Sequence, residues 1–210
     1  MPVDVASHLG AVQRSVQALE RDGKPARAVV LARSYDTDID DLWNALTSAE
    51  RLPRWFLPVE GELKLGGRYQ LKGNAGGTIT DCEAPVHLGL TWEMHGQVSW
   101  VEVRLAREAE ARTRFTLTHT AHLSEFWTQF GPGAVGVGWE GGLMGLALHL
   151  AAPTSRMDEA TFSASPEGKR FLAGSSERWG EAAIAAGEDP EVAAAAVRAT
   201  TAFYTGQPPA

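Results

Sequence analysis

The sequence of 210 residues has little cysteine and no excess of positive charge. Its single cysteine, Cys82, cannot form an internal disulfide, which excludes a disulfide-stapled secreted scaffold. Lysine and arginine number 19 against 26 acidic residues, the net charge is −7, and there is no long basic run. A surface that neutralises phosphates is therefore not expected, so we expect neither nucleic acid nor a membrane as a partner.

Long apolar stretches are also missing. The most apolar window, GPGAVGVGWEGGLMGLALHL at 131–150, is interrupted by Glu140, His149 and several glycines. It falls short of the roughly 20 apolar residues that cross a bilayer. The first residues, MPVDVASHLG, lack the layout of a secretory signal. We therefore expect a soluble, cytoplasmic protein with one core-bearing domain and appendages.

The same window begins with the glycine spacing of a dinucleotide-binding loop, at Gly131, Gly133 and Gly136. Such a loop must leave a parallel strand and lie inside a βαβ unit. Here the segment SEFWTQF comes before it, and the strands predicted upstream are antiparallel, so no nucleotide or other cofactor is expected. The pattern instead predicts a helix over 134–151 whose glycines allow close approach by a sheet or a bound molecule.

Most of the remaining pattern predicts strands of period two. Along these strands apolar residues alternate with polar ones, so one face is apolar and the other polar. This is typical of an antiparallel sheet with one buried face. Asp36–Asp38 offers caps for a short helix, and Thr47 with Glu50 predicts a second one that breaks at Pro53. The predicted strands are 27–36, a hairpin within 59–72 around Gly66–Gly67, 77–83, 86–93, 97–106 and 112–120.

Helices are predicted at both ends of the chain. Apolar residues at helical spacing from Val5 to Leu19 predict an amphipathic N-terminal helix. Ser165-Pro166 and Asp189-Pro190 are start signals, and Gly187 and Gly206 are stop signals, for a C-terminal helical hairpin. The apolar faces of these helices are too large to remain in water, so we expect them to pack on the domain or to form a homodimer.

Three segments carry a family resemblance: RSYDTDIDDLWNALTSAERLPRWFLPV, LGGRYQL and GGTITDCEAPVHLGLTWE. They resemble the START-like, or SRPBCC, superfamily, in the branch named after the activator of the 90-kDa heat-shock protein ATPase. The resemblance implies an α+β helix-grip fold, in which a curved antiparallel sheet wraps around a C-terminal helix. We therefore expect an N-terminal helical extension at 1–25, the helix-grip domain at 26–152, and the helical hairpin extension at 153–210.

Histidines are the main candidates for chemistry. His119, His122 and Glu125 lie near the end of the last strand, but residues three apart on a strand point to opposite faces, so no metal site is expected. His119 shares a face with Phe115 and Leu117 and should look into the concave side of the sheet. It could be a hydrogen-bonded core histidine, a ligand contact or an acid/base residue, and we assign no catalytic residue.

The aromatic side chains point to a binding function. Seven tryptophans are many for this length, and several lie where a helix-grip cavity would be lined. We therefore expect a small hydrophobic or aromatic molecule between the sheet and the long helix. The alternatives are a co-chaperone-like protein-interaction domain and a cyclase or dehydratase that uses His119. The expected ligand contacts are Trp55, Trp92, Phe115, His119, Phe126, Trp127, Trp139 and Leu143.

Overall fold

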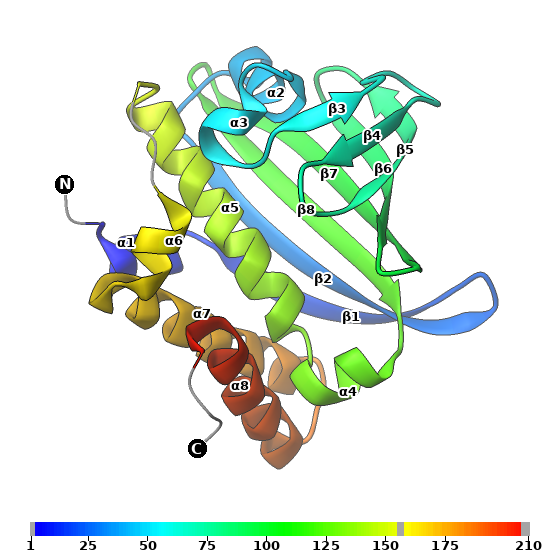
Figure 1. Ribbon diagram of the computed structural model, residues 1–210, viewed down its shortest axis with the longest axis vertical. Helices are drawn as coiled ribbons and strands as arrows, with labels where there is room; N and C mark the ends of the chain where they lie inside the picture. The colour runs from blue at the N-terminus through cyan, green and yellow to red at the C-terminus, as the bar shows by residue number, and fades with distance from the viewer. Residues whose placement is uncertain (1–2, 155–157, 207–210) are drawn as a thin grey trace. The chain divides into compact units, whose positions relative to one another are not determined.

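Figure 1 shows the computed structural model, in which residues 3–154 and 158–206 are described. The chain forms two compact units. The first unit is drawn from 1–31, 122–144 and 157–210, and the second from 32–121 and 145–156. The strand β2 and the long helix α5 belong partly to each unit, and so does β8 through its last residue, His122, so each unit is built from segments that are distant in sequence.

Eight strands form one sheet in the order β1-β2-β8-β7-β6-β5-β4-β3. From β3 to β8 each strand pairs antiparallel with the next, as the alternating pattern predicted. The strands are Gln13–Arg21 (β1), Lys24–Tyr35 (β2), Val59–Gly61 (β3), Arg68–Leu71 (β4), Gly76–Glu83 (β5), His87–Met94 (β6), Gln97–Ala109 (β7) and Arg112–His122 (β8).

The helices occur in three groups along the chain: one before the sheet, two short ones after β2, and five after β8. The expected helix at 134–151 is confirmed as α5, and the hairpin at the end of the chain as α7 and α8. The helices are Val5–Gly10 (α1), Ile39–Thr47 (α2), Leu52–Trp55 (α3), Glu125–Phe130 (α4), Gly133–Ala151 (α5), Glu159–Ala164 (α6), Pro166–Ala185 (α7) and Pro190–Thr205 (α8).

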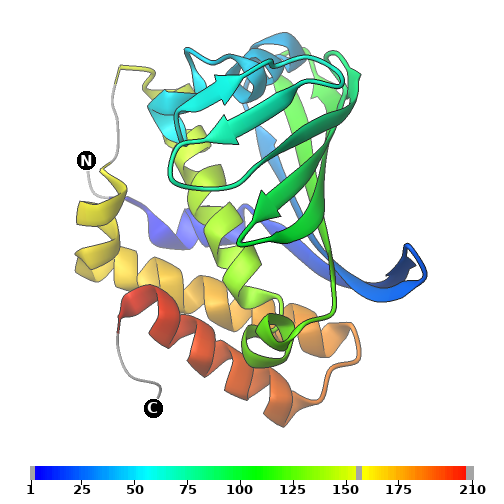
Figure 2. The same cartoon turned by 45° about the vertical axis from the view of Figure 1, so that its right-hand side comes forward.

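Local capping sets the boundaries of the C-terminal helices. The Ser165 hydroxyl accepts a hydrogen bond from the Gly168 N–H at the start of α7, and the Asp189 carboxylate caps α8. Gly206 ends α8 in the left-handed conformation at φ +66°. Both views show α7 and α8 side by side, as the start and stop signals in the sequence predicted (Figures 1 and 2).

A buried ion pair joins β1 to α5 inside the first unit. The Arg14 guanidinium donates two hydrogen bonds of 2.6 Å to the Glu140 carboxylate, and others to the carbonyls of Leu9 and Val12. The two charged side chains are only 6% and 1% exposed. Glu140, which interrupts the apolar window, is therefore a structural anchor for the helix.

The prediction of one N-terminal helix up to residue 21 was wrong, because the helix α1 ends at Gly10 and the strand β1 follows. Val12, Arg14 and Val16 alternate with exposed residues, so this stretch also fits a period of two. Asp22 and Gly23 both have positive φ, at 52° and 71°, as in a two-residue hairpin turn. The Asp-Gly pair that we interpreted as a helix stop therefore connects two strands.

Two smaller expectations also need correction. The hairpin within 59–72 uses Val59–Gly61 as its first strand, while Leu63 and Leu65 lie in the connection and are 38% and 62% exposed. The Gly67 N–H donates to the Lys64 carbonyl, which closes a tight turn there. Pro53 does not break the helix α3 but lies in its first turn. Backbone N–H groups in the first turn have no acceptor within the helix, so the missing N–H of a proline costs no hydrogen bond there.

Candidate functional site

One face of the sheet in the second unit carries a continuous set of apolar side chains. On β6, Leu88 and Leu90 are paired with Val103 and Val101 of β7, and Val101 is paired in turn with His119 of β8. Directly paired residues of neighbouring strands share a face. The row from Leu90 to His119 therefore crosses three strands on one side of the sheet.

Exposure changes across this face. At Val101 of β7 and Phe115 of β8 the side chains are closed off from solvent, at 3% and 1% exposed. On β6, by contrast, Leu88, Leu90 and Trp92 are all only partly buried. The strand β6 therefore presents three consecutive same-face apolar side chains that pack against the buried cluster of Tyr69, Leu71 and Ile79 but are not fully covered in the described structure.

A polar pair lies beside this partly exposed strip. His119 is 7% exposed, and its Nε2 is 2.8 Å from the Ser99 hydroxyl. Ser99 is paired with Trp92, whose ring centre lies 6.1 Å from that of His119. Burial lowers the pKa of His119 from 6.5 to about 4, so the imidazole is neutral at pH 7. His119 is thus a buried, hydrogen-bonded histidine next to an indole.

The other residues predicted to touch a ligand are divided between the two units. In the second unit, Trp55 donates from Nε1 to the Ala45 carbonyl at 2.9 Å, and Phe115 contacts Tyr35 edge-on at 6.3 Å. In the first unit, Leu143 is 2% exposed and Phe126 is 46% exposed, while Trp127 and Trp139 are half-buried. Within the second unit the structure brings together Trp92 and His119, and joint contact of all eight residues with one ligand stays a prediction.

The glycines of α5 permit close approach, but the neighbours at Gly136, Gly138 and Gly145 are residues of other helices rather than the sheet or bound molecule that the sequence analysis expected. A Cβ atom on Gly145 would lie 2.6 Å from the Trp55 carbonyl oxygen, and one on Gly138 would lie 2.9 Å from the Tyr204 hydroxyl. A side chain on Gly136 would collide with the Trp179 indole. At these three positions the close neighbours are other parts of the protein. The glycine-rich spacing therefore serves packing: Gly131 caps the end of α4 and Gly133 begins α5, next to an antiparallel sheet rather than inside a βαβ unit.

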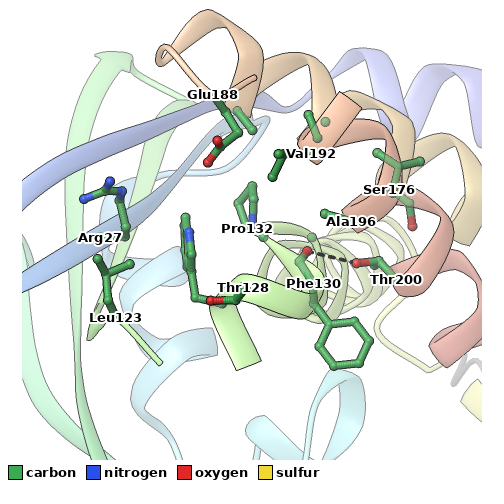
Figure 3. A pocket seen from close by; sticks show the side chains of 17 residues that line it. Arg27, Leu123, Thr128, Phe130, Pro132, Ser176, Glu188, Val192, Ala196 and Thr200 are labelled. Atoms are coloured by element: carbon green, nitrogen blue, oxygen red, sulfur yellow. Dashed lines mark hydrogen bonds between the residues drawn. The ribbon is translucent and has the colours of Figure 1, made fainter. Parts of the chain in front are cut away.

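The first unit contains a pocket of its own, shown in Figure 3. It is formed by α4, α7, α8 and the start of β2, and its volume is about 260 Å³. Of the eight predicted ligand contacts, only Trp127 lines it. The sequence offered a weak signal for this pocket, because the small residues Gly180, Ala183 and Ala196 recur at helical spacing on the two helices of the hairpin.

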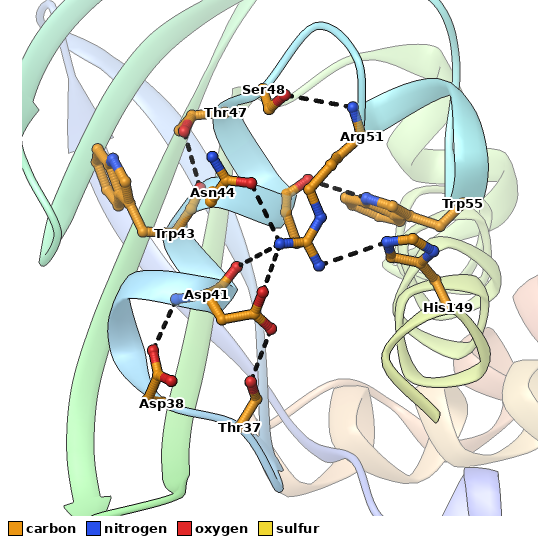
Figure 4. A network of polar contacts seen from close by, with 11 residues as sticks. Thr37, Asp38, Asp41, Trp43, Asn44, Thr47, Ser48, Arg51, Trp55 and His149 are labelled. Carbon is orange, nitrogen blue, oxygen red and sulfur yellow. Dashed lines mark hydrogen bonds and ion pairs between the residues drawn. The ribbon is translucent and has the colours of Figure 1, made fainter. Parts of the chain in front are cut away.

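A polar network holds the helices α2 and α3 in the second unit (Figure 4). Arg51 donates to the Asp41 carboxylate at 2.5 Å and to the Asn44 side-chain oxygen at 3.2 Å, and Thr37 donates to Asp41 at 2.7 Å. Burial opposes ionisation of Asp41, but the bonds from Arg51 and Thr37 outweigh it and hold the pKa of Asp41 below its usual value. Sequence analysis did not identify this network.

His149, in the last turns of α5, joins the same network. Its Nε2 lies 3.5 Å from an Arg51 nitrogen, and the side chain is 2% exposed. Since a guanidinium has only donors, Nε2 must accept, which places the proton of the neutral ring on Nδ1. Burial, followed by the charges of Arg51 and Arg54, lowers the pKa of His149. His149 is therefore a neutral structural contact, and its Nδ1 has no hydrogen-bond partner among the described residues.

Within residues 3–154 and 158–206, no three His, Cys, Asp or Glu side chains are grouped so that they could hold a metal ion. In this described part of the chain, no helix combines the length and the apolar character needed to span a membrane. His122 instead contacts the Arg21 carbonyl through Nε2, at 3.0 Å.

The comparison with protein families decides the relationship that these features suggest. Residues 36–151, more than half of the chain, match the family described as activator of Hsp90 ATPase homolog 1-like protein. The chain belongs to this family. This confirms the resemblance found in the sequence, and with it the α+β helix-grip fold. No match was found among curated proteins.

Solved structures support the same assignment. The crystal structure of CalU16 from Micromonospora echinospora is 30% identical, with a TM-score of 0.69 over 83% of this chain and 99% of that one. Its solution structure is 31% identical, with a TM-score of 0.72 over 84% and 97%. These shares exceed the 36–151 segment, so the likeness includes part of the terminal elements. A protein of unknown function, EF2215 from Enterococcus faecalis, shares the fold at 18% identity, with a TM-score of 0.62 over 88% and 96%.

Proposed function

We propose that this protein binds a small hydrophobic, aromatic molecule on the apolar face of the second unit, over β6 and beside His119. The observation that carries the proposal is the strip formed by Leu88, Leu90 and Trp92, which remains partly exposed while Val101 and Phe115 on the neighbouring strands are closed off from solvent. Partly exposed apolar side chains on a concave fold are typical of ligand sites. The family fold, which commonly encloses hydrophobic molecules, supports the same function.

The side chains at this strip have distinct roles in the proposed complex. The Trp92 indole offers a flat surface for an aromatic ring, in the offset or edge-to-face geometry that such pairs prefer. His119 is neutral and already hydrogen-bonded to Ser99, so this pair presents a polar group without a charge. A ligand with one hydroxyl or carbonyl on an otherwise apolar ring system fits this combination, because its polar atom has a partner there.

The two alternatives are less well supported by the same residues. An acid/base role for His119 in a cyclase or dehydratase works best with a pKa near the working pH. Burial instead lowers the pKa of His119 to about 4. A co-chaperone-like interaction surface would call for a charged or broadly exposed patch, whereas the strip on β6 is apolar and half-buried. Binding of a small molecule therefore remains the function that we propose.

The test uses two matched tryptophan variants of the full chain. Trp100 lies on the strand next to β6 but is paired with Thr91 and Thr120, which places it on the opposite face from Trp92. The neutral fluorescent probe N-phenyl-1-naphthylamine is titrated into the wild type, Trp92→Leu and Trp100→Leu. Trp92→Leu should weaken probe binding about fivefold, because an aromatic pair contributes about 1 kcal/mol beyond the area it buries. Trp100→Leu should bind like the wild type.

Native mass spectrometry of freshly purified protein supplies the second measurement. We expect a co-purified small molecule in the wild type that is lost or reduced in Trp92→Leu and retained in Trp100→Leu. Equal probe affinities of the two variants would remove the strip on β6 as the site. A wild-type protein that neither binds the probe nor retains any molecule would contradict the proposed function itself.

A further inference from the structure

The buried part of the pocket in the first unit is mainly apolar, and its two buried hydroxyls, those of Ser176 and Thr200, already donate hydrogen bonds. Ser176 and Thr200 line it and are 1% and 0% exposed, but each hydroxyl already donates to a backbone carbonyl. Ser176 donates to Leu172 at 2.8 Å and Thr200 to Phe130 at 3.1 Å. Satisfied hydroxyls gain little from a new partner. The buried part of the pocket is therefore suited to an apolar body.

The rim of the pocket is different, because it carries the guanidinium of Arg27. Arg27 lines the pocket and is half-buried (Figure 3). Within the described part of the chain, its hydrogen bond goes from Nη1 to the neighbouring Ala26 carbonyl, at 3.2 Å. It forms no ion pair with any carboxylate in the described ranges 3–154 and 158–206. A half-buried guanidinium is a preferred partner for a carboxylate, because its donors match the two oxygens.

One acidic group also lies at the rim. Glu188 lines the pocket, but its side chain is exposed, and one of its oxygens accepts the Asp189 N–H at 3.1 Å. Solvent and salt screen its charge, so it opposes an anionic ligand only weakly. Arg27 is half-buried whereas Glu188 is exposed, so the positive charge of Arg27 is the one that a bound molecule would meet with less screening.

Size limits the ligand further. A volume of about 260 Å³ is below the roughly 300–1,000 Å³ of sites for drug-sized molecules. We propose that this pocket is a second binding site, separate from the strip on β6, for a small apolar carboxylic acid with one or two rings. The ring system would lie among Trp127, Val192 and Ala196, and the carboxylate would pair with Arg27.

The experiment compares an acid with its neutral isostere on the full chain. Binding of 1-naphthoate and of 1-naphthamide is measured by calorimetry and by the indole N–H resonance of Trp127, assigned by its loss in Trp127→Phe. We expect 1-naphthoate to shift this resonance and to bind more tightly than the amide. Arg27→Gln should weaken binding of the acid about tenfold or more and leave the amide unchanged, because only the acid uses the charge.

Glu188→Gln is the matched variant of opposite sign. Removing this screened acid should tighten binding of 1-naphthoate by a few-fold and again leave the amide unchanged. Thermal melting of both variants checks that the fold is retained. Three results would each overturn the proposal: no shift of the Trp127 resonance by 1-naphthoate, equal binding of acid and amide, or an equal loss of both ligands in Arg27→Gln. If Trp92→Leu binds 1-naphthoate like the wild type, the pocket beside Arg27 is independent of the strip on β6.

Discussion

Replacing Glu140 by glutamine tests how much of the first unit depends on its buried ion pair. The substitution keeps the size of the side chain but removes the negative charge that faces Arg14. The Arg14 guanidinium then keeps its bonds to two carbonyls but loses the carboxylate that balances its charge, in a position where its side chain is 6% exposed. An unpaired buried charge destabilises a protein by about 3–5 kcal/mol.

The magnitude is large relative to the stability of an ordinary domain, which is about 5–15 kcal/mol. For a chain of this size it corresponds to a melting temperature lowered by roughly 6–20 °C. The double variant Arg14→Met with Glu140→Leu removes both charges together. It should recover most of the lost stability, because the loss comes from leaving one charge without its partner rather than from the absence of the pair.

The chain offers a matched control in a second arginine–glutamate pair. Arg68 and Glu93 are joined by hydrogen bonds of 2.8 and 3.4 Å, but their side chains are 66% and 33% exposed. Glu93→Gln should therefore leave the unfolding midpoint in urea close to that of the wild type, since water solvates either partner. If Glu140→Gln lowers stability no more than Glu93→Gln does, burial is not what gives the Arg14 pair its importance.

Three further predictions concern the helices and the histidine of the sheet. The pKa of His119 is about 4 in the folded protein and 6.5 in the unfolded chain, so the unfolded chain binds a proton first as the pH falls. The contribution of neutral His119 to stability is therefore complete above pH 6.5 and falls by about 3 kcal/mol as the pH approaches 4. Urea unfolding of His119→Gln should then depend less on pH, and parallel curves would refute this. Gly136→Ala should lower the melting temperature by collision with Trp179, whereas Gly141→Ala, with open space around it, should raise it slightly. Phe203 is 59% exposed on a terminal helix. If the predicted homodimer forms through the terminal helices, Phe203→Ser should shift sedimentation toward the monomer. A wild-type protein that sediments as a monomer would contradict the homodimer.

The sequence alone was sufficient where structure follows from neighbouring residues. The caps Ser165 and Asp189 and the stop at Gly206 determine the ends of α7 and α8 through bonds to residues two or three positions away. The alternation on β7 and β8 predicted the buried face, because a strand has one period and one inner side. The family and its fold were also recognisable from contiguous segments.

Local pattern was ambiguous at the N-terminus. Val12 and Val16 are four residues apart. That spacing places them on one face of a helix, and equally on one face of a strand, where every second residue points the same way. The Asp22-Gly23 turn and pairing within the sheet decide for the strand β1. Edge strands with few buried residues give a weak periodic signal, so only the partner strand determines the outcome.

The sites were determined by tertiary structure. Arg14 and Glu140 are 126 positions apart, and Arg51 and His149 are 98 positions apart, so no spacing rule connects them. The pocket beside Arg27 exists because α4, α7 and α8 converge on the start of β2. Sequence reasoning selected aromatic residues and His119 by type and face, but their exposure depends on what packs over each strand. Burial and the pairing of charges are properties of the folded chain, because they arise from contacts between segments that lie far apart in the sequence.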